Sequence, residues 1–310
     1  MRAYGRAQKR IFMSDFIITT DNAADLYFGY YEANPTTRLP MPFSVAGKNY
    51  EFEEECPAYM DYYDLLKQGH LVKTAQVNRQ TAHDMLKKVL EETGKDLLFI
   101  SFSSGMSGSY DSICAVANEL RLEFPDRRIE VVDSLSGAGG EGLLVYYAQK
   151  MQREGASMDE VIQWIEDNKC NAHHIFIVDD LKNLKHSGRI STIAALLGMV
   201  MQLKPILELN NDGKIALLGK ALGRKKAMSE ITRYFAEYYE DGKNDFILIG
   251  HTGNQADADA LAKRIKEAVP TVPPIKFGYI NRLVSGNAGY NALVVFMMGK
   301  QRKKHIIEQI

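Results

Sequence analysis

Short apolar runs alternate along this chain with longer segments in which apolar residues recur at helical spacing. Runs that are followed by Ser, Thr, Asp or Gly predict buried strands at 16–20, 97–100, 129–132, 175–178 and 246–249. Segments with a 3.6-residue apolar period predict helices at 59–68, 81–93, 110–124, 141–153 and 158–168. Strands and helices that alternate in this way indicate parallel β-structure joined by right-handed crossovers.

The second half of the chain adds a hairpin signal. The turn at 211–213 (Asn-Asp-Gly) separates two apolar flanks, which predicts a pair of antiparallel strands. Further strands are expected at 276–280 and 292–297, and further helices at 194–203, 224–239 and 256–269. A chain of 310 residues exceeds the roughly 100–200 residues of one domain. We therefore expect an α/β protein with two domains: residues 14–171 as a parallel α/β/α sandwich, and residues 172–310 as an α/β domain with a mixed sheet.

Serine and glycine are concentrated where one predicted strand leads into a helix. Five serines and two glycines stand in the segment 101–109, directly after the run 97–100. Such a junction offers free backbone N–H groups at the positive end of a helix dipole, and it therefore binds anions. Asp21 and Asp133 end two other predicted strands, and the carboxyl ends of parallel strands meet at one edge of a sheet, where ligands collect. The segment also suits an ordinary loop with a helix N-cap, so both interpretations stay open here.

The bulk composition argues against several classes of function. A net charge of -1 provides no basic footprint for nucleic acid. Cys56, Cys114 and Cys170 are far apart and odd in number, which favours a reducing cytoplasm over a disulfide framework or a cysteine-rich metal site. The apolar stretch 193–203 is about half the length that spans a bilayer, and the run 11–13 is too short for a secretory signal. We expect a cytoplasmic protein without membrane insertion.

Three motif-like features do not fit the chemistry they suggest. The glycines of 137–142 match G-x-G-x-x-G, but they do not follow a strand directly, so we expect them to let a helix start pack closely against a sheet. The segment 105–109 has its first glycine one place too early for a nucleophile elbow, and no spacing selects a histidine as its base. His173 and His174 are adjacent and would face opposite sides of a strand, so a metal site is not expected.

Seven segments carry a resemblance that spans almost the whole chain after residue 14. They are Ile18–Leu26, Lys73–Gln76, Ser103–Tyr110, Val132–Ser134, Val178–Ile190, Lys204–Leu207 and Asp212–Ile215. In this order they resemble the DegV family, whose members bind fatty acids. No single segment is decisive, but their order and their coverage make the match specific.

The resemblance implies that one long acyl chain lies in an apolar tunnel between or beside the two domains. Some relatives are the binding component of a bacterial fatty acid kinase, in which a separate ATP-binding kinase phosphorylates the acyl carboxylate and the product enters phospholipid synthesis. By this resemblance the chain is not an enzyme and has no catalytic residue, cofactor or metal of its own. Its ligand is a long-chain fatty acid, and its possible partner is the kinase subunit.

The family pattern also implies the ligand-binding residues, which are Thr74, Ser103, Ser104, Ser107, Arg189 and Asn287. Thr74 and one serine of the cluster would hydrogen-bond the carboxylate, and Arg189 would lie near the head group or the kinase contact. Asn287 stands where the family has histidine, and Ala75 stands where serine is common. Asparagine donates an N–H but carries no titratable proton, so fatty acid binding is better supported than phosphoryl transfer.

Two other functions remain open, and so does the identity of the tunnel wall. The chain could be an acyl-lipid sensor or storage protein without a kinase partner, or a serine hydrolase that uses Ser104 or Ser107. A dry tunnel wall is expected from residues that could equally form plain core, namely Ile113, Leu196, Leu197, Met199, Val200 and Met201.

Overall fold

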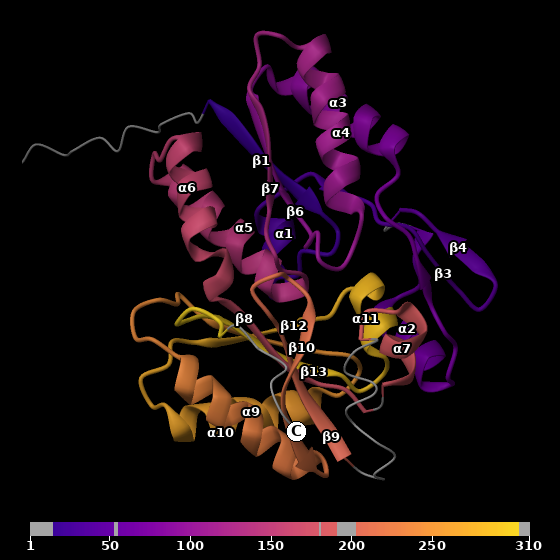
Figure 1. The fold of residues 1–310 in the computed structure, drawn as a ribbon, viewed down its shortest axis with the longest axis vertical. Helices are drawn as coiled ribbons and strands as arrows, with labels where there is room; N and C mark the ends of the chain where they lie inside the picture. Colours follow the sequence, from indigo (N-terminus) through magenta and orange to yellow (C-terminus); the bar gives the residue numbers. More distant parts are fainter. Residues whose placement is uncertain (1–14, 53–54, 180, 191–202, 304–310) are drawn as a thin grey trace, which may run out of the picture.

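The computed structural model describes residues 15–52, 55–179, 181–190 and 203–303 of the chain. Two sheets lie one above the other in Figure 1, and helices cover both. The upper sheet is parallel and the lower one is mixed, so the predicted α/β fold is confirmed. The predicted boundary at 171/172 stays a prediction; it falls between the last strand of the upper sheet and the first strand of the lower one.

The upper sheet has four parallel strands in the order β2-β1-β6-β7. They span Arg38–Leu39, Phe16–Asp21, Asp96–Ser101 and Ile129–Asp133. On one face Leu97 and Phe99 pack against α3 (Arg79–Thr93) and α4 (Ser109–Glu123). On the other face Leu98 and Ile100 pack against α5 and α6, which span Ala138–Arg153 and Met158–Asn168. Both faces are buried, and this is why the strand at 96–101 is a continuous apolar run.

The lower sheet has six strands in the order β10-β9-β8-β13-β11-β12. They span Ile215–Leu222, Leu203–Leu209, Ala172–Ile177, Leu293–Met298, Ile247–His251 and Ile275–Tyr279. Only β11 and β12 run parallel, and β9 and β10 form the predicted hairpin. Its turn is closed by a hydrogen bond from the Gly213 N–H to the Asn210 carbonyl (3.0 Å), with Gly213 at φ +67°.

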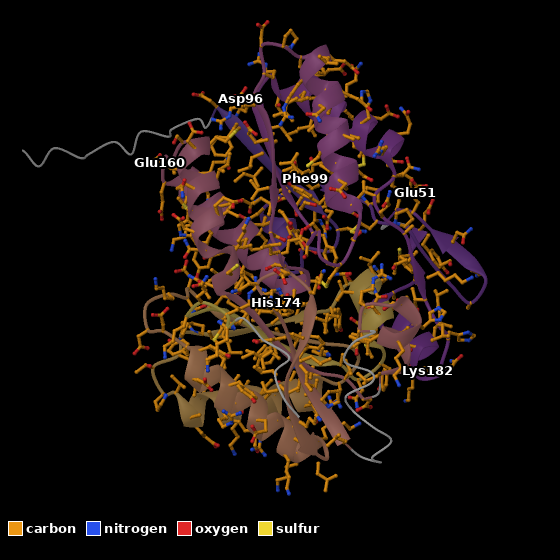
Figure 2. The ribbon with its side chains drawn as sticks, in the orientation of Figure 1. Glu51, Asp96, Phe99, Glu160, His174 and Lys182 are labelled. Atoms are coloured by element: carbon orange, nitrogen blue, oxygen red, sulfur yellow. The ribbon has the colours of Figure 1, made fainter. Side chains whose placement is uncertain are left out.

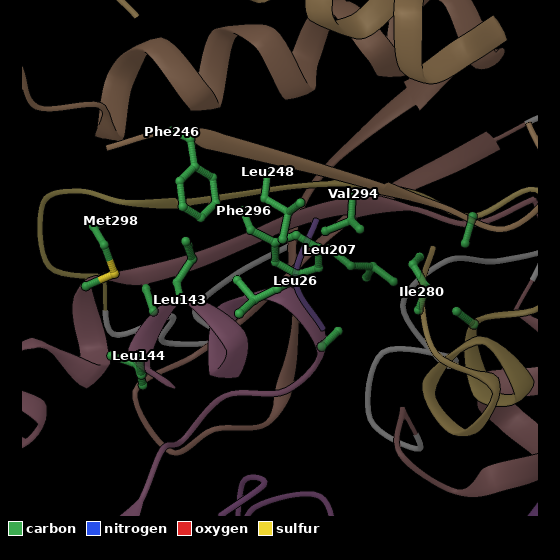
Figure 3. Close-up of a cluster of buried hydrophobic side chains, with 14 of the residues drawn as sticks. Leu26, Leu143, Leu144, Leu207, Phe246, Leu248, Ile280, Val294, Phe296 and Met298 are labelled. Atoms are coloured by element: carbon green, nitrogen blue, oxygen red, sulfur yellow. The ribbon is translucent and has the colours of Figure 1, made fainter. Parts of the chain in front are cut away.

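The two faces of the lower sheet pack against different partners. The lower face rests on α9 (Arg224–Tyr238) and α10 (Gln255–Ala268). The upper face packs against α5, as the cluster of Leu143, Leu207 and Phe296 in Figure 3 shows. Helix α5 therefore lies between the two sheets, and nearly all of its first two turns is buried.

The remaining elements are a small sheet and several short helices. The three-stranded sheet has the order β4-β3-β5, and α2, α7 and α11 lie near it in Figure 1. The bounds of these elements are Phe43–Val45 for β3, Lys48–Tyr50 for β4, Lys73–Thr74 for β5, Tyr59–Lys67 for α2, Lys182–Ser187 for α7 and Arg282–Ala288 for α11. Two further short helices lie elsewhere in the chain: α1 (Tyr30–Ala33) follows β1, and the 3-10 helix η2 (Lys169–Asn171) lies between α6 and β8. The hydroxyls of Tyr62 and Tyr63 in α2 donate to the carbonyls of Arg282 and Ile280 (2.5 and 2.6 Å), which joins this segment to the second half of the chain.

Several predictions about single elements are confirmed, and one predicted helix start differs from the structure. His173 stacks on Tyr238 below the sheet, and His174 meets Phe296 above it, so the two histidines do face opposite sides. Helix α5 begins at Ala138 rather than Glu141, because its glycines take part in the first helical turn. The helix expected at 194–203, with its five wall residues, lies outside the described residues except for Leu203. Within the described ranges, no helix combines the length and the apolar character that crossing a membrane requires.

Candidate functional site

An apolar cavity lies between the lower sheet and the part of the chain that precedes β8, which is called the upper unit below. Its cavity volume is about 100 Å³. Strands of the lower sheet supply Phe176, Leu209, Ile215, Val294 and Phe296 to its wall, and the upper unit supplies Met41, Phe102 and Met106. The polar residues of the lining are Thr74, Ser107, His174, Arg189 and Asn287. An apolar pocket with a few polar groups in its wall is typical of a small-molecule site.

Ser107 lies just before α4 and is held there by two contacts with Ser109. Its Oγ accepts a hydrogen bond from the Ser109 N–H (3.2 Å) and lies 2.9 Å from the Ser109 Oγ. The Ser109 Oγ in turn accepts from the Val77 N–H (3.1 Å). When the Ser109 hydroxyl donates to Ser107, both acceptor positions of Ser107 are used. Its own proton is then free for a group in the cavity.

Thr74 reaches the same region from β5. It pairs with Phe43 of β3, and the next residue, Ala75, donates its N–H to the Pro42 carbonyl (2.8 Å). The chain that follows lies against the loop of Ser107, because the Gln76 side chain donates to Ser112 of α4 (3.0 Å). Thr74 and Ser107 therefore belong to neighbouring segments of the wall.

Arg189 brings a positive charge to the same part of the cavity. It follows Gly188, the αL cap of α7 at φ +77°. Its Nε donates to the Met106 carbonyl (3.3 Å), one residue before Ser107, and its Nη1 donates to the Ser187 carbonyl. No carboxylate within the described ranges forms an ion pair with it. A guanidinium in a largely apolar wall favours an anionic ligand.

Asn287 lies on α11, and its side-chain amide has two N–H donors and one oxygen acceptor. Its Nδ2 donates to the Leu283 carbonyl one turn earlier in the helix (3.2 Å). Its Oδ1 is buried and has no hydrogen-bond partner. One of the two amide N–H groups is thus used within the helix, and the amide keeps a second one.

Ser103 and Ser104 do not line the cavity. Ser103 is fully buried, and its Oγ donates to the Gly213 carbonyl in the hairpin turn (2.8 Å). Ser104 is exposed, and its N–H donates to Asp133 Oδ1 (3.2 Å). Ser103 thus holds the loop against the hairpin of the lower sheet, and the backbone of Ser104 holds it against the end of β7. Ser107 is the one residue of the predicted serine cluster that lines the cavity. Ile113, an expected wall residue, instead lies in the core beneath α4.

His174 lines the cavity, although it was not among the ligand-binding residues expected from the sequence (Figure 2). Its Nε2 accepts a hydrogen bond from the Gly137 N–H (3.4 Å), and burial holds its pKa well below 6.5, so the ring is neutral. A Cβ on Gly140 would lie 1.9 Å from this Nε2, and a Cβ on Gly139 would lie 2.4 Å from the Phe296 ring. The close packing expected of these glycines is confirmed. The alternation of β8 places His174 and Phe176 on one face, and this was the signal available in the sequence.

Two buried carboxyl groups lie behind the cavity wall, where β1 ends. Asp21 accepts the N–H groups of Ala23 and Phe102 (3.0 and 2.9 Å), which fixes the chain just before Ser103. Desolvation on burial raises the pKa of Asp21 to about 6. The same cause raises the pKa of Glu141, in the first turn of α5, well above 4.5.

Hydrogen bonding gives an independent reason for a proton on Glu141. Thr20 Oγ1 lies 2.8 Å from the Ile100 carbonyl oxygen and 3.0 Å from Glu141 Oε1. A threonine hydroxyl has one proton and a carbonyl oxygen has none, so Thr20 donates to Ile100. A proton on Glu141 completes the second contact, which agrees with the raised pKa of this carboxyl group.

The described residues lack the parts that two other chemistries need. No three metal-ligating side chains come together in them. The ring of His174, which lines the cavity, bonds to a backbone N–H, and no histidine in the described part of the chain hydrogen-bonds to Ser103, Ser104 or Ser107. The arrangement is suited to holding an amphipathic anion.

Known proteins match this chain over nearly its whole length. The model of the family described as "Uncharacterised protein, DegV family" matches residues 15–300. A DegV domain-containing protein of Clostridium perfringens is 33% identical over 294 residues, which cover 94% of this chain and 100% of the relative. A fatty acid binding DegV family protein from Streptococcus agalactiae has a similar structure, with TM-score 0.81, 26% identity, and 93% and 100% of the two chains covered. A stearic acid-binding protein from Eubacterium ventriosum gives TM-score 0.83 at 20% identity over 92% and 98%.

Proposed function

Because this chain belongs to the DegV family, we propose that it binds one long-chain fatty acid in the cavity between its two sheets. The observation that carries the proposal is the cavity wall, which is mostly apolar and includes the hydroxyls of Thr74 and Ser107 and the guanidinium of Arg189. The carboxylate lies against these three residues, and the acyl chain extends over Phe176, Phe296 and their neighbours. Solved relatives that bind stearic acid and heptadecanoic acid support this choice of ligand.

The tail supplies most of the binding free energy and the head group supplies the orientation. Each CH₂ group removed from water contributes roughly 0.8 kcal/mol, so a chain of sixteen or more carbons outweighs any single polar contact. The carboxylate loses its hydration on entry, and that loss is offset by the Arg189 charge and the hydroxyl of Ser107. The protein holds the fatty acid and has no catalytic residue of its own.

Mass spectrometry of a solvent extract of the purified protein tests the proposal. We expect a bound fatty acid in the extract, and uptake of added oleate or palmitate by the protein. The absence of both would contradict the proposal. Thr74→Val and Ser107→Ala should each weaken palmitate binding by about 1–3 kcal/mol, because a buried carboxylate loses a partner. Ser104→Ala is the matched control, because Ser104 is an exposed serine of the same loop outside the cavity. An affinity unchanged in both cavity variants would place the head group elsewhere.

We further propose that the bound carboxylate is presented to a separate ATP-dependent fatty acid kinase. The family resemblance supports this partner, and Lys185 and His186 are exposed on α7 close to Arg189. Asn287 favours the alternative of a sensor or storage protein, because it offers no titratable proton at the head group. Formation of acyl phosphate from the loaded protein, ATP and a cognate kinase distinguishes the two. Turnover of an acyl ester by the protein alone would instead favour a hydrolase.

A further inference from the structure

A buried carboxyl group fixes the backbone of one residue of the cavity wall. Asp21 ends β1 and is completely buried, yet it is not among the residues that line the cavity. Its Oδ2 accepts the Phe102 N–H at 2.9 Å, and its Oδ1 accepts the Ala23 N–H at 3.0 Å. Phe102 does line the cavity. Asp21 is therefore one hydrogen bond away from the cavity wall.

The side chain of Phe102 is as closely held as its backbone. A Cβ on Gly137, another residue of the wall, would lie 2.3 Å from the Phe102 ring, so the ring packs directly against the backbone before α5. The next residue, Ser103, accepts the N–H groups of Met106 and Ser107 with its carbonyl (3.1 and 3.2 Å). Both of these residues line the cavity as well. The bond from Asp21 thus helps to place a continuous section of the wall.

The surroundings of Asp21 make its charge sensitive to pH. An ionised carboxylate loses its hydration on burial, and no lysine, arginine or histidine of the described residues forms an ion pair with it. The ionisable side chains around this site are acidic or phenolic, namely Glu141 of α5, Asp25, Asp133 and Tyr31. Burial raises the pKa of Asp21 to about 6, although the two backbone N–H groups and Glu141 oppose the rise. Asp21 therefore changes its charge near neutral pH.

We propose that Asp21 is a positioning residue for ligand binding: its carboxylate holds Phe102, and with it Met106 and Ser107, in the conformation that receives the fatty acid. The inference rests on the proposed function, because it takes this cavity as the fatty acid site. A protonated Asp21 accepts the Phe102 N–H less well, since one of its oxygens then carries a proton. The wall then populates other conformations, and the apparent affinity falls with the fraction that remains competent. Fatty acid affinity is therefore higher above the pKa of Asp21 than below it.

Titration of the delipidated full-length chain with cis-parinaric acid, a fluorescent fatty acid, tests the inference at pH 5 and pH 8. Asp21→Ala removes both acceptors, so at pH 8 it should bind the probe about five- to tenfold more weakly than the unmodified chain. At pH 5 the two chains should differ by less than about twofold, because Asp21 of the unmodified chain is then protonated. The ionisation of the probe itself cancels, since the chains are compared at the same pH.

Asp96→Ala is the matched control. Asp96 begins β6, whereas Phe102 follows the end of that strand, and Asp96 accepts the Arg128 N–H, also at 2.9 Å, away from the cavity. This variant should bind the probe as the unmodified chain does at both pH values. A loss of affinity in Asp21→Ala that is equal at pH 5 and pH 8, or no loss at all, would overturn the inference and leave fatty acid binding intact. No binding by the unmodified chain at either pH would overturn the proposed function and the inference together.

A second measurement decides the question if circular dichroism shows that Asp21→Ala does not fold. Binding that favours the ionised form of Asp21 must release protons from the unmodified chain when it takes up palmitate at pH 6, because the linkage is reciprocal. Calorimetry in two buffers with different ionisation enthalpies counts these protons. Release at pH 6 that vanishes at pH 8 would support the inference, and the absence of release at pH 6 would overturn it.

Discussion

Replacing Glu141 with glutamine should stabilise the folded protein relative to the unmodified chain, and this advantage should grow as the pH rises. Glu141 is fully buried, and a proton on its carboxyl group completes the contact with Thr20. Burial raises its pKa well above 4.5, the value of an exposed glutamate. Between these two pKa values the unfolded chain has lost the proton and the folded chain has kept it. The unfolded state then binds fewer protons, so the free energy of unfolding falls as the pH increases.

The magnitude follows from linkage. A single group that holds a proton only in the folded state lowers the free energy of unfolding by about 1.4 kcal/mol for each pH unit in that window. Glutamine carries an N–H that can donate to Thr20 and does not titrate, so the Glu141→Gln chain lacks this slope. Asp21, with its pKa of about 6, is present in both chains, so its own titration largely cancels in the comparison.

Urea unfolding followed by circular dichroism at pH 5, 6 and 7 measures the effect. The stability of Glu141→Gln relative to the unmodified chain should grow with pH, by up to about 1.4 kcal/mol per pH unit while the pH is below the folded-state pKa of Glu141. Glu119→Gln, at an exposed position of α4, is the control and should show no such trend. A difference that stays constant from pH 5 to pH 7 would mean that Glu141 is ionised in the folded state, and it would refute the assignment of the proton.

Two further substitutions test the packing around the cavity. Gly140→Ala places a methyl group 1.9 Å from the His174 ring, so the free energy of unfolding should fall by about 1–3 kcal/mol and the melting temperature should fall with it. His174→Ala in the same chain should restore part of the loss. An unchanged melting temperature in Gly140→Ala would contradict the close contact. Ser103→Ala removes the donor to the Gly213 carbonyl and should cost about 1–3 kcal/mol of unfolding free energy, whereas Ser104→Ala should cost little, and equal effects of the two would argue against the tie to the hairpin.

Much of the fold could be predicted from the chain because its local signals agree with its tertiary structure. The buried run 97–100 and the turn at 211–213 act through neighbouring residues, and both predicted elements are present. The start of α5 was misplaced because glycine weakens the helical signal there. In this case the contacts with His174 and Phe296, which are distant in sequence, outweigh local propensity.

The site was less accessible to prediction, for reasons that also lie in distant contacts. Ser103 and Ser107 are chemically alike, but only Ser107 lines the cavity. Ser103 instead hydrogen-bonds to a hairpin turn more than 100 residues later in the chain, a contact that local sequence does not reveal. Phe176 and Val294 line a cavity, but on a strand they show the same alternation as residues of a solid core. Only the assembled sheets distinguish a wall from a core.

The position of α5 between the two sheets has a consequence for how this chain can be divided. Leu143 and Leu144 precede residue 172 in sequence, yet they complete the apolar layer above β8 and β13. A fragment that starts at 172 would expose that layer to water, and a fragment that ends at 171 would expose one side of its own helix. The chain should therefore melt in a single transition, and a chimera between relatives should exchange α5 together with the lower sheet if it is to remain soluble.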